Sequence, residues 1–222
     1  RSSAASDVYK RQVEASVGAD FVSNYIWRGT DCGGVSIQPS MGVSYKGLSL
    51  AAWGSVGIDK EDAREIDLTL GYNTGGFNVS VTDYWFSYHK EDGGYTGDYF
   101  KYGAHSTIHI FEATLGYDFG PLALSWNTYF AGDDYTKENG DRAYSTYVGI
   151  SAPFKLGGLD WSAEVGLTPW EGAYANKFNV TNLTLKAEKE IKFTNSFSLP
   201  TFAQVTFNPH TQGAYFVFGV SF

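Results

Sequence analysis

The sequence has few of the residues on which several classes of protein depend. Among its 222 residues there is one cysteine, Cys32, which excludes an internal disulfide and a zinc site built from several cysteines. Lysine and arginine number 16 against 24 acidic residues, and they form no cluster. Because nucleic-acid binding depends on a basic patch that neutralises phosphates, we expect no nucleic-acid partner.

Long apolar runs are also missing. No stretch reaches the roughly 18 consecutive apolar residues that a transmembrane helix needs. A membrane protein is not excluded by this, because β-barrels cross bilayers with alternating strands of modest average hydropathy. No secretory signal peptide, which an outer-membrane protein needs for export, is recognisable at the start of the sequence.

Glycine and aromatic residues are abundant. The chain has 26 glycines and 17% aromatic residues, whereas 18% of its residues are charged and 6 are prolines. This profile indicates a β-rich fold with many turns. From Val13 onward apolar residues recur with a period of two, which predicts strands. Twelve segments follow this pattern: residues 13–27, 35–45, 48–58, 64–72, 77–87, 108–117, 122–131, 144–152, 159–167, 178–187, 196–207 and 214–222.

The predicted connections alternate in length. Tight turns are expected near residues 46, 74, 119 and 155, and longer polar connections at 28–34, 59–63, 88–107, 132–143, 168–177 and 208–213. Such alternation places short turns at one end of a barrel and long loops at the other. A slip in the apolar pattern near Asn182 predicts a β-bulge.

Residue type on the two faces favours a membrane barrel over a soluble one. The second face is rich in Gly, Ser, Thr, Asn and carboxylates, which suit a watery lumen better than a dry core. Aromatic residues gather where strands end, as in the interfacial belts of membrane proteins. These are Tyr45, Tyr72 and Tyr117 beside short turns, and Tyr25, Trp27, Trp85, Phe130 and Tyr144 beside long loops. We therefore predict an all-β fold, a single transmembrane antiparallel up-and-down β-barrel of about 12 strands, with short periplasmic turns and long extracellular loops.

Two stretches resemble known proteins. The final "AYFVFGVSF" resembles the last strand of Gram-negative outer-membrane barrels. That resemblance implies location in the cell outer membrane, among its lipids, and recognition of Phe218, Val220 and Phe222 by the barrel-assembly machinery. The stretches "GADFVSNYIWRGT" and "SIQPSMGVSYKGLSLAAWGS" resemble the opening of uncharacterised TorF-like porins, which implies an outer-membrane barrel without an assigned substrate.

The first residues resemble something else. "RSSAASDVYKRQ" is similar to a translated sequencing-adapter artefact. We expect residues 1–12 to be artefactual or disordered and residues 13–222 to form the barrel.

The face predicted to line the lumen carries more acidic than basic residues. Its acidic members are Glu14, Asp20, Glu65, Asp67, Glu112, Glu164 and Glu188, and its basic members are Arg28, Arg64 and Lys186. Inward aromatic residues, Tyr84, Tyr129, Tyr147, Phe202 and Tyr215, narrow the lumen. One interpretation is a field that favours cations or amine-bearing solutes. The other is a hydrogen-bonded plug, with pairs such as Glu164 and Lys186.

Three further expectations concern single features. Arg28, at the top of the first segment, is a candidate partner for Asp20 or for an anionic group of a solute. Asp83 has the parity of the lipid-facing residues, so we expect it near the rim. The loop at 88–107 has a composition suited to covering the mouth or binding sugars, or to a mobile surface loop.

Catalysis is not expected. A serine hydrolase needs a histidine beside a serine and an orienting partner, and no run of the sequence resembles such a motif. The histidines, His89, His105, His109 and His210, fall in or beside long loops, with spacings that match no dedicated metal site. No cofactor is predicted.

The sequence therefore favours one functional hypothesis over two others. The first is an outer-membrane channel for passive passage of small solutes through a narrow, acidic and aromatic-lined lumen. The second is a structural or adhesive barrel with a plugged lumen. The third is an outer-membrane lipid-modifying enzyme, such as a lipid hydrolase.

Overall fold

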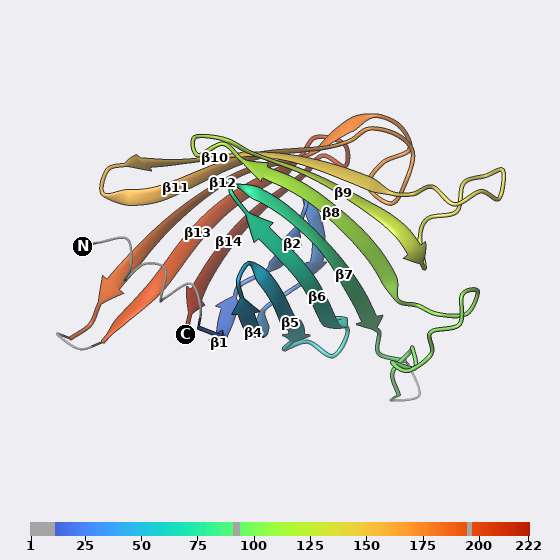
Figure 1. Cartoon of the computed structure of the whole chain (residues 1–222), viewed down its shortest axis with the longest axis horizontal. Helices are drawn as coiled ribbons and strands as arrows, with labels where there is room; N and C mark the ends of the chain where they lie inside the picture. Colours follow the sequence, from blue (N-terminus) through green and yellow to red (C-terminus); the bar gives the residue numbers. More distant parts are fainter. Residues whose placement is uncertain (1–11, 91–93, 195–196) are drawn as a thin grey trace.

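The fold is a β-barrel with a small second sheet. The computed structural model describes residues 12–90, 94–194 and 197–222, in which strands are joined by turns and loops (Figure 1). The predicted artefactual segment, residues 1–12, lies outside the described residues except for Gln12. So does residue 196, where one predicted strand begins.

Twelve antiparallel strands form the closed barrel, each beside its neighbours in sequence, which confirms the predicted up-and-down topology. Their order around the ring starts at β1, continues to β14 and then runs back to β4, which closes on β1. The barrel strands are β1 (Glu14–Val22), β4 (Ser36–Tyr45), β5 (Leu48–Gly57), β6 (Arg64–Thr74), β7 (Phe77–Ser87), β8 (Ile110–Asp118), β9 (Ala123–Gly132), β10 (Thr146–Leu156), β11 (Leu159–Thr168), β12 (Asn179–Lys192), β13 (Ser198–Asn208) and β14 (Gly213–Ser221).

The seam of the barrel joins the first and last strands. Phe21 of β1 lies opposite Val220 of β14. Just beyond, Ala19 and Phe222 exchange backbone hydrogen bonds of 3.2 and 2.9 Å. The final segment therefore closes the barrel against the first one, as its alternating pattern predicts.

The two faces of the wall differ in chemistry. In β14, Phe216 and Phe218 point outward and are exposed, whereas Val217 between them is buried. The same alternation runs through β6, where Leu68 is exposed and Glu65 is buried. An apolar outer face with a polar inner face is the arrangement of a membrane-spanning barrel. In the part of the chain that the structure describes, no helix has the length and apolar character needed to cross a bilayer.

Short turns and long loops lie at opposite ends, as predicted. The turn between β4 and β5 consists of Lys46 and Gly47, both with positive φ. Two such residues match the type I′ geometry that suits two-residue hairpins. In Figure 1 the short turns are toward the left, with the C-terminus, and the longer connections are toward the right.

Several boundaries differ from the prediction or refine it, and β12 continues to Lys192 rather than ending at residue 187. The first barrel strand ends at Val22 rather than at residue 27, and residues Tyr25–Trp27 form β2, which pairs with β3 (Thr30–Gly33). β10 continues to Leu156, through the turn predicted near residue 155, because two glycines with positive φ follow it. The bulge predicted near Asn182 is present, since the register with β11 shifts there and leaves Thr181 unmatched.

The loop between β7 and β8 packs on the outer wall. His109 is fully buried, with Nδ1 at 2.7 Å from Asp83 and Nε2 at 2.7 Å from the carbonyl oxygen of Tyr99. The hydroxyl of Tyr102 donates to the same Asp83 carboxylate at 3.3 Å. Asp83 is therefore shielded on the outer face, and the described part of the loop does not cover the mouth. Part of the loop, residues 91–93, lies outside the described residues.

Candidate functional site

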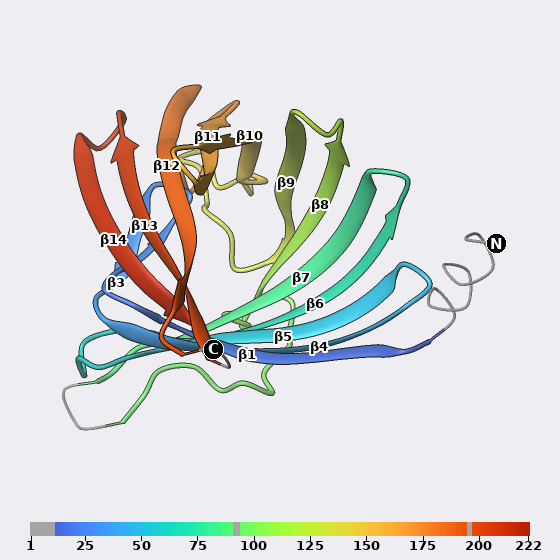
Figure 2. The same cartoon turned by 90° about the vertical axis from the view of Figure 1, so that its left-hand side faces the viewer.

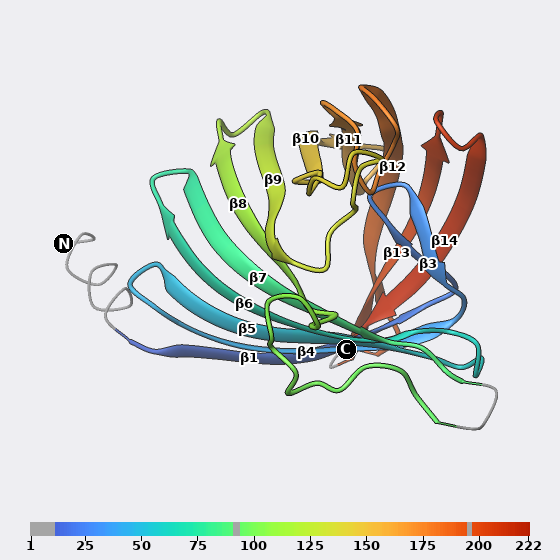
Figure 3. The ribbon, with the colours of Figure 1, turned by 90° about the vertical axis from the view of Figure 1, so that its right-hand side faces the viewer.

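A hairpin made of β2 and β3 stands inside the barrel. It leaves the wall after Val22, where the chain passes from β1 toward β4. Figure 2 and Figure 3 show it as a blue ribbon within the ring of strands, on the inner side of β13 and β14. Its tip is a two-residue turn, because Trp27 pairs with Thr30.

The turn residues are Arg28 and Gly29, with φ of 50° and 79°. Positive φ at both positions defines a type I′ turn, which favours glycine, asparagine or aspartate. Arginine there costs about 1 kcal/mol relative to those residues. The contacts of Arg28 therefore have to offset this cost.

Gly29 fixes the tip against the opposite wall. A Cβ atom at this position would lie 2.0 Å from the carbonyl oxygen of Thr181 in β12. The side-chain amide of Asn208 in β13 donates to the carbonyl oxygen of Gly29 at 3.0 Å. Only a glycine allows the two backbones to approach this closely.

Arg28 reaches in the other direction, to β8. Its guanidinium donates two hydrogen bonds to the Glu112 carboxylate, Nη1 to Oε2 at 2.5 Å and Nη2 to Oε1 at 2.8 Å. The carboxylate also accepts from the Tyr84 hydroxyl at 3.0 Å. Glu112 is 1% exposed, so this ion pair is almost fully removed from water. A bidentate geometry with a further donor is what a buried pair needs to offset its desolvation.

Aromatic rings surround the same guanidinium. Its central carbon lies 4.2 Å from the ring centre of Trp27 and 4.8 Å from that of Tyr147. Tyr174 accepts a hydrogen bond from Nη1 at 2.6 Å and donates to Tyr129 at 3.1 Å. Cation–π attraction of this kind strengthens as water is excluded. We name the constriction layer as Trp27, Arg28, Tyr84, Glu112, Tyr129, Tyr147 and Tyr174.

A second hydrogen-bonded group continues the layer around the wall. The Tyr147 hydroxyl donates to Oε1 of Glu164 at 2.5 Å. The side-chain amide of Asn182 donates to that oxygen and to the Tyr147 hydroxyl, both at 3.0 Å. Among the residues that the structure describes, the hydrogen bonds to Glu164 therefore come from neutral donors, and no cation pairs with it.

Loops at the long-loop end hold Tyr174 in place. The backbone nitrogen of Ala173 donates to Oγ of the buried Ser145 at 2.8 Å, and that hydroxyl donates to Asp134 at 2.5 Å. The indole nitrogen of Trp170 donates to the Ala143 carbonyl at 3.1 Å. The loops after β9 and β11 are thus fastened to each other beside the hairpin.

The hairpin separates two cavities. The outer vestibule, of about 310 Å³, is lined by hairpin and long-loop residues including Tyr25, Glu65 and Tyr88. The inner cavity, of about 320 Å³, is lined by Arg28 and polar wall residues such as Gln204. Trp27 borders both cavities, so the constriction layer lies between them.

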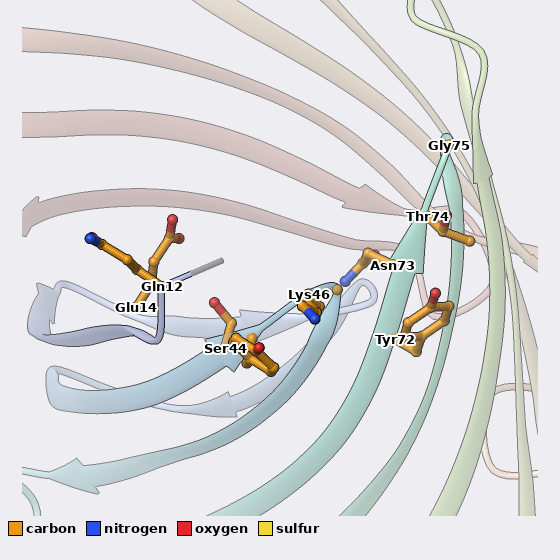
Figure 4. Close-up of a pocket in the computed structure, with 10 residues that line it drawn as sticks. Gln12, Glu14, Ser44, Lys46, Tyr72, Asn73, Thr74 and Gly75 are labelled. Carbon is orange, nitrogen blue, oxygen red and sulfur yellow. The ribbon is translucent and has the colours of Figure 1, made fainter. Parts of the chain in front are cut away.

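Another cavity, of about 470 Å³, lies far from the layer at the short-turn end. Figure 4 shows Glu14, Ser44 and Lys46 at its edge, together with residues of the turn that follows Tyr72. The exposed Glu14 therefore belongs to the barrel rim.

The predicted lumen residues divide into two groups. Those brought together at the hairpin are Arg28, Glu112, Tyr129, Tyr147 and Glu164. The others point inward elsewhere: Asp20 in β1, Glu65 and Asp67 in β6, Lys186 in β12 and Tyr215 in β14.

Several predicted partners are wrong. Arg28 pairs with Glu112 and not with Asp20, because the hairpin carries it across the lumen. Lys186 lies 2.6 Å from Glu188 rather than beside Glu164, because neighbouring inward positions of one strand are closer than that diagonal pair.

Three residues face a different way from the prediction. Arg64 has the outward parity of β6 and stacks on Tyr95 of the long loop, 3.7 Å from its ring centre. Tyr25 and Trp27 lie in the lumen and not at the lipid interface, because the chain has already left the wall.

The prediction also missed residues of the site. Trp53, whose ring centre is 5.4 Å from that of Tyr25, has the inward parity of its segment, whereas Tyr174 and Asn208 carry no local signal. The hairpin itself has one, since "WRGT" repeats the pattern of "YKGL" at the Lys46 turn: an aromatic residue, a basic residue and a glycine. Among the residues that the structure describes, no cluster of His, Cys, Asp or Glu could hold a metal ion.

Comparisons with known proteins add little. No family model matches the chain, and no curated protein matches it. Among solved structures, one match is the crystal structure of BamA from Haemophilus ducreyi lacking POTRA domains 1-3, at 11% sequence identity and a TM-score of 0.41. The match covers 88% of this chain and 41% of that one, so the chain spans about two fifths of the matched structure.

Proposed function

We propose that this protein is a channel for small solutes in the outer membrane of a Gram-negative bacterium, and that its hairpin controls passage. The proposal is supported by the closed barrel, its apolar outer face and its polar inner face. The predicted excess of carboxylates in the lumen favours cationic or amine-bearing solutes over anions.

One observation carries the proposal. The constriction layer lies between two cavities, and its central ion pair joins Arg28, at the tip of the hairpin, to Glu112 in the wall. A solute that crosses the barrel has to pass this layer. Neither strand of the hairpin is hydrogen-bonded into the barrel ladder, so the hairpin can leave its contacts with the wall without opening the ring.

The same layer also supports a second function, a structural or adhesive barrel with a permanently plugged lumen. The favouring observation is that the Arg28 guanidinium already has a carboxylate, a hydroxyl and aromatic faces around it. A saturated buried network of this kind can rigidify a core.

Ion conductance in planar bilayers distinguishes the two. The refolded wild type is expected to give small, cation-preferring currents, and Arg28→Ala is expected to give larger ones because the tip loses its anchor. Glu14→Gln, at the rim, is the matched control and should conduct like the wild type. Folded protein that remains silent both in the wild type and in Arg28→Ala would contradict the channel.

Two further expectations remain proposals. The barrel-assembly machinery is proposed to recognise Phe218, Val220 and Phe222, of which Phe218 and Phe222 are exposed on the outer face. The absence of enzymatic activity also remains a prediction. A lipid hydrolase would alter labelled phospholipids in mixed micelles, and we expect no such turnover.

A further inference from the structure

The outer vestibule has the composition of a cation-binding pocket. Its lining contains two carboxylates, Asp31 and Glu65, and no lysine, arginine or histidine. Aromatic rings form much of the rest: Tyr25, Trp27, Phe86, Tyr88, Tyr129 and Tyr174. The cavity borders the long-loop end, since Ala63, Tyr88 and Ala173 come from or adjoin the loops there.

Glu65 is buried in this pocket without a cationic partner. It is 4% exposed, and the groups that interact most with its carboxyl are Tyr25 and Asp67. Neither Glu65 nor Asp31 forms an ion pair within the described residues. A buried carboxylate that lacks a cation is costly, and binding a cation relieves that cost.

Two arginines that adjoin vestibule residues in the sequence have partners elsewhere. Arg64, next to Glu65, points outward and stacks on Tyr95. Arg28 is held by Glu112 on the other side of the hairpin. The charge of the vestibule is therefore left for a ligand to neutralise.

The rings that border the vestibule already hold one cation. Trp27 and Tyr174 contact the guanidinium of Arg28 at ring-centre distances of 4.2 and 5.8 Å. The ring centres of Tyr25 and Trp53 lie 5.4 Å apart, which helps to hold the Tyr25 ring at the pocket. Aromatic faces beside a carboxylate are the recurring way in which proteins bind alkylammonium groups.

We propose that the outer vestibule is a binding site for a small organic amine, with the ammonium group beside Glu65 and its carbon substituents against the aromatic rings. The cavity of about 310 Å³ is equivalent to roughly ten waters at about 30 Å³ each, which fits a ligand of about ten non-hydrogen atoms. This inference rests on the proposed function, since it names the solute class that enters the lumen from the loop side.

Asp67 occupies the neighbouring inward position of β6 and interacts with Glu65, so a second acidic group lies close to the pocket.

The test is calorimetric titration of the full chain, refolded in detergent, with choline. The control ligand is 3,3-dimethyl-1-butanol, which has the same shape without the charge. Wild type is expected to bind choline in preference to the alcohol, and Glu65→Gln to weaken choline binding about tenfold or more, as expected for the loss of about 1.4 kcal/mol. Glu14→Gln, at the opposite end, should bind like the wild type.

Three results would overturn the site: no choline binding to folded wild type, equal binding of the alcohol, or unchanged binding in Glu65→Gln. Circular dichroism of each variant establishes that the barrel has formed. Binding without bilayer current would leave the site intact and reject the channel. Current without choline binding would reject the site and leave the channel intact.

Discussion

At the scale of the residue, Arg28 links the hairpin to the wall. It occupies a left-handed conformation that arginine rarely adopts, and its guanidinium has a bidentate carboxylate partner that is 1% exposed. Removing one member of such a pair leaves the other charge buried and unpaired. The strength of this link is therefore open to measurement by a double-mutant cycle.

The first prediction concerns that cycle. Arg28→Ala and Glu112→Ala should each lower the free energy of unfolding by about 3 kcal/mol, and the double variant by clearly less than their sum. Arg28→Lys should recover only part of the loss, because an ammonium cannot reproduce the two-pronged geometry. Urea unfolding in detergent micelles, applied to the wild type and to all four variants, measures these losses. Additive losses would show that the two side chains act independently.

A second prediction at this scale uses the single cysteine. Burial and the nearby Glu65 charge raise the pKa of the Cys32 thiol to about 12. The reactive thiolate forms only as pH rises toward that value, so at pH 8 iodoacetamide should alkylate Cys32 at least about a hundredfold more slowly than a free thiol with a pKa near 8.5.

Glu65→Gln provides the check on the cause. It removes the negative charge that raises the pKa, so alkylation at pH 8 should become faster, as mass spectrometry of the labelled protein can measure. Equal rates in both proteins would mean that Glu65 does not act on the thiol. Glu14→Gln should leave the rate unchanged.

At the scale of the element, the hairpin depends on Gly29. Its φ of 79° is unfavourable for other residues, and a Cβ atom at this position would lie 2.0 Å from the Thr181 carbonyl oxygen. Gly75, in the turn after β6, also has positive φ, at 56°, but nothing lies within 4 Å of the place its Cβ would occupy. Replacing each glycine by alanine therefore separates two effects on stability: the unfavourable backbone conformation, which both positions share, and the steric clash of the Cβ atom, which only Gly29 has.

The third prediction compares them. Gly29→Ala should displace the tip from β12 and increase bilayer current, whereas Gly75→Ala should cost about 1 kcal/mol of stability and leave the current unchanged. Both variants are measured in the same membrane and salt. Equal currents in the two variants would show that docking of the tip does not limit passage.

The strands could be predicted from the sequence, but the hairpin could not be separated from them. A repeat of apolar residues at every second position shows which residues share a face. This repeat identified the barrel strands because each strand has one apolar side. Tyr25 and Trp27 continue the parity of Val13 and Phe21, so the pattern runs on after the chain has left the wall. Parity does not reveal whether a strand belongs to the wall or to the lumen.

The partners of the inward charges were beyond prediction for a related reason. Arg28 and Glu112 are 84 residues apart, and they meet only because the hairpin crosses the ring. Ring closure, rather than distance along the sequence, decides which inward side chains are neighbours. The bulge at Thr181 was predictable because it changes the local pattern itself.

At the scale of the whole molecule, the barrel is divided into two compartments by one inward element. The compartments differ in chemistry, since aromatic rings and carboxylates line the outer vestibule and amides, hydroxyls and Glu164 line much of the inner cavity. Solute selection at the loop side and control of passage at the hairpin would then be separate steps. Both steps require that the hairpin limits passage through the lumen.

The most direct measurement is single-channel conductance after the hairpin, residues 25–33, is replaced by a short glycine and serine linker. The account predicts a several-fold larger cation current than in the wild type, with circular dichroism showing an intact barrel. A replaced chain that folds and conducts no better than the wild type would contradict the claim that this hairpin controls the lumen.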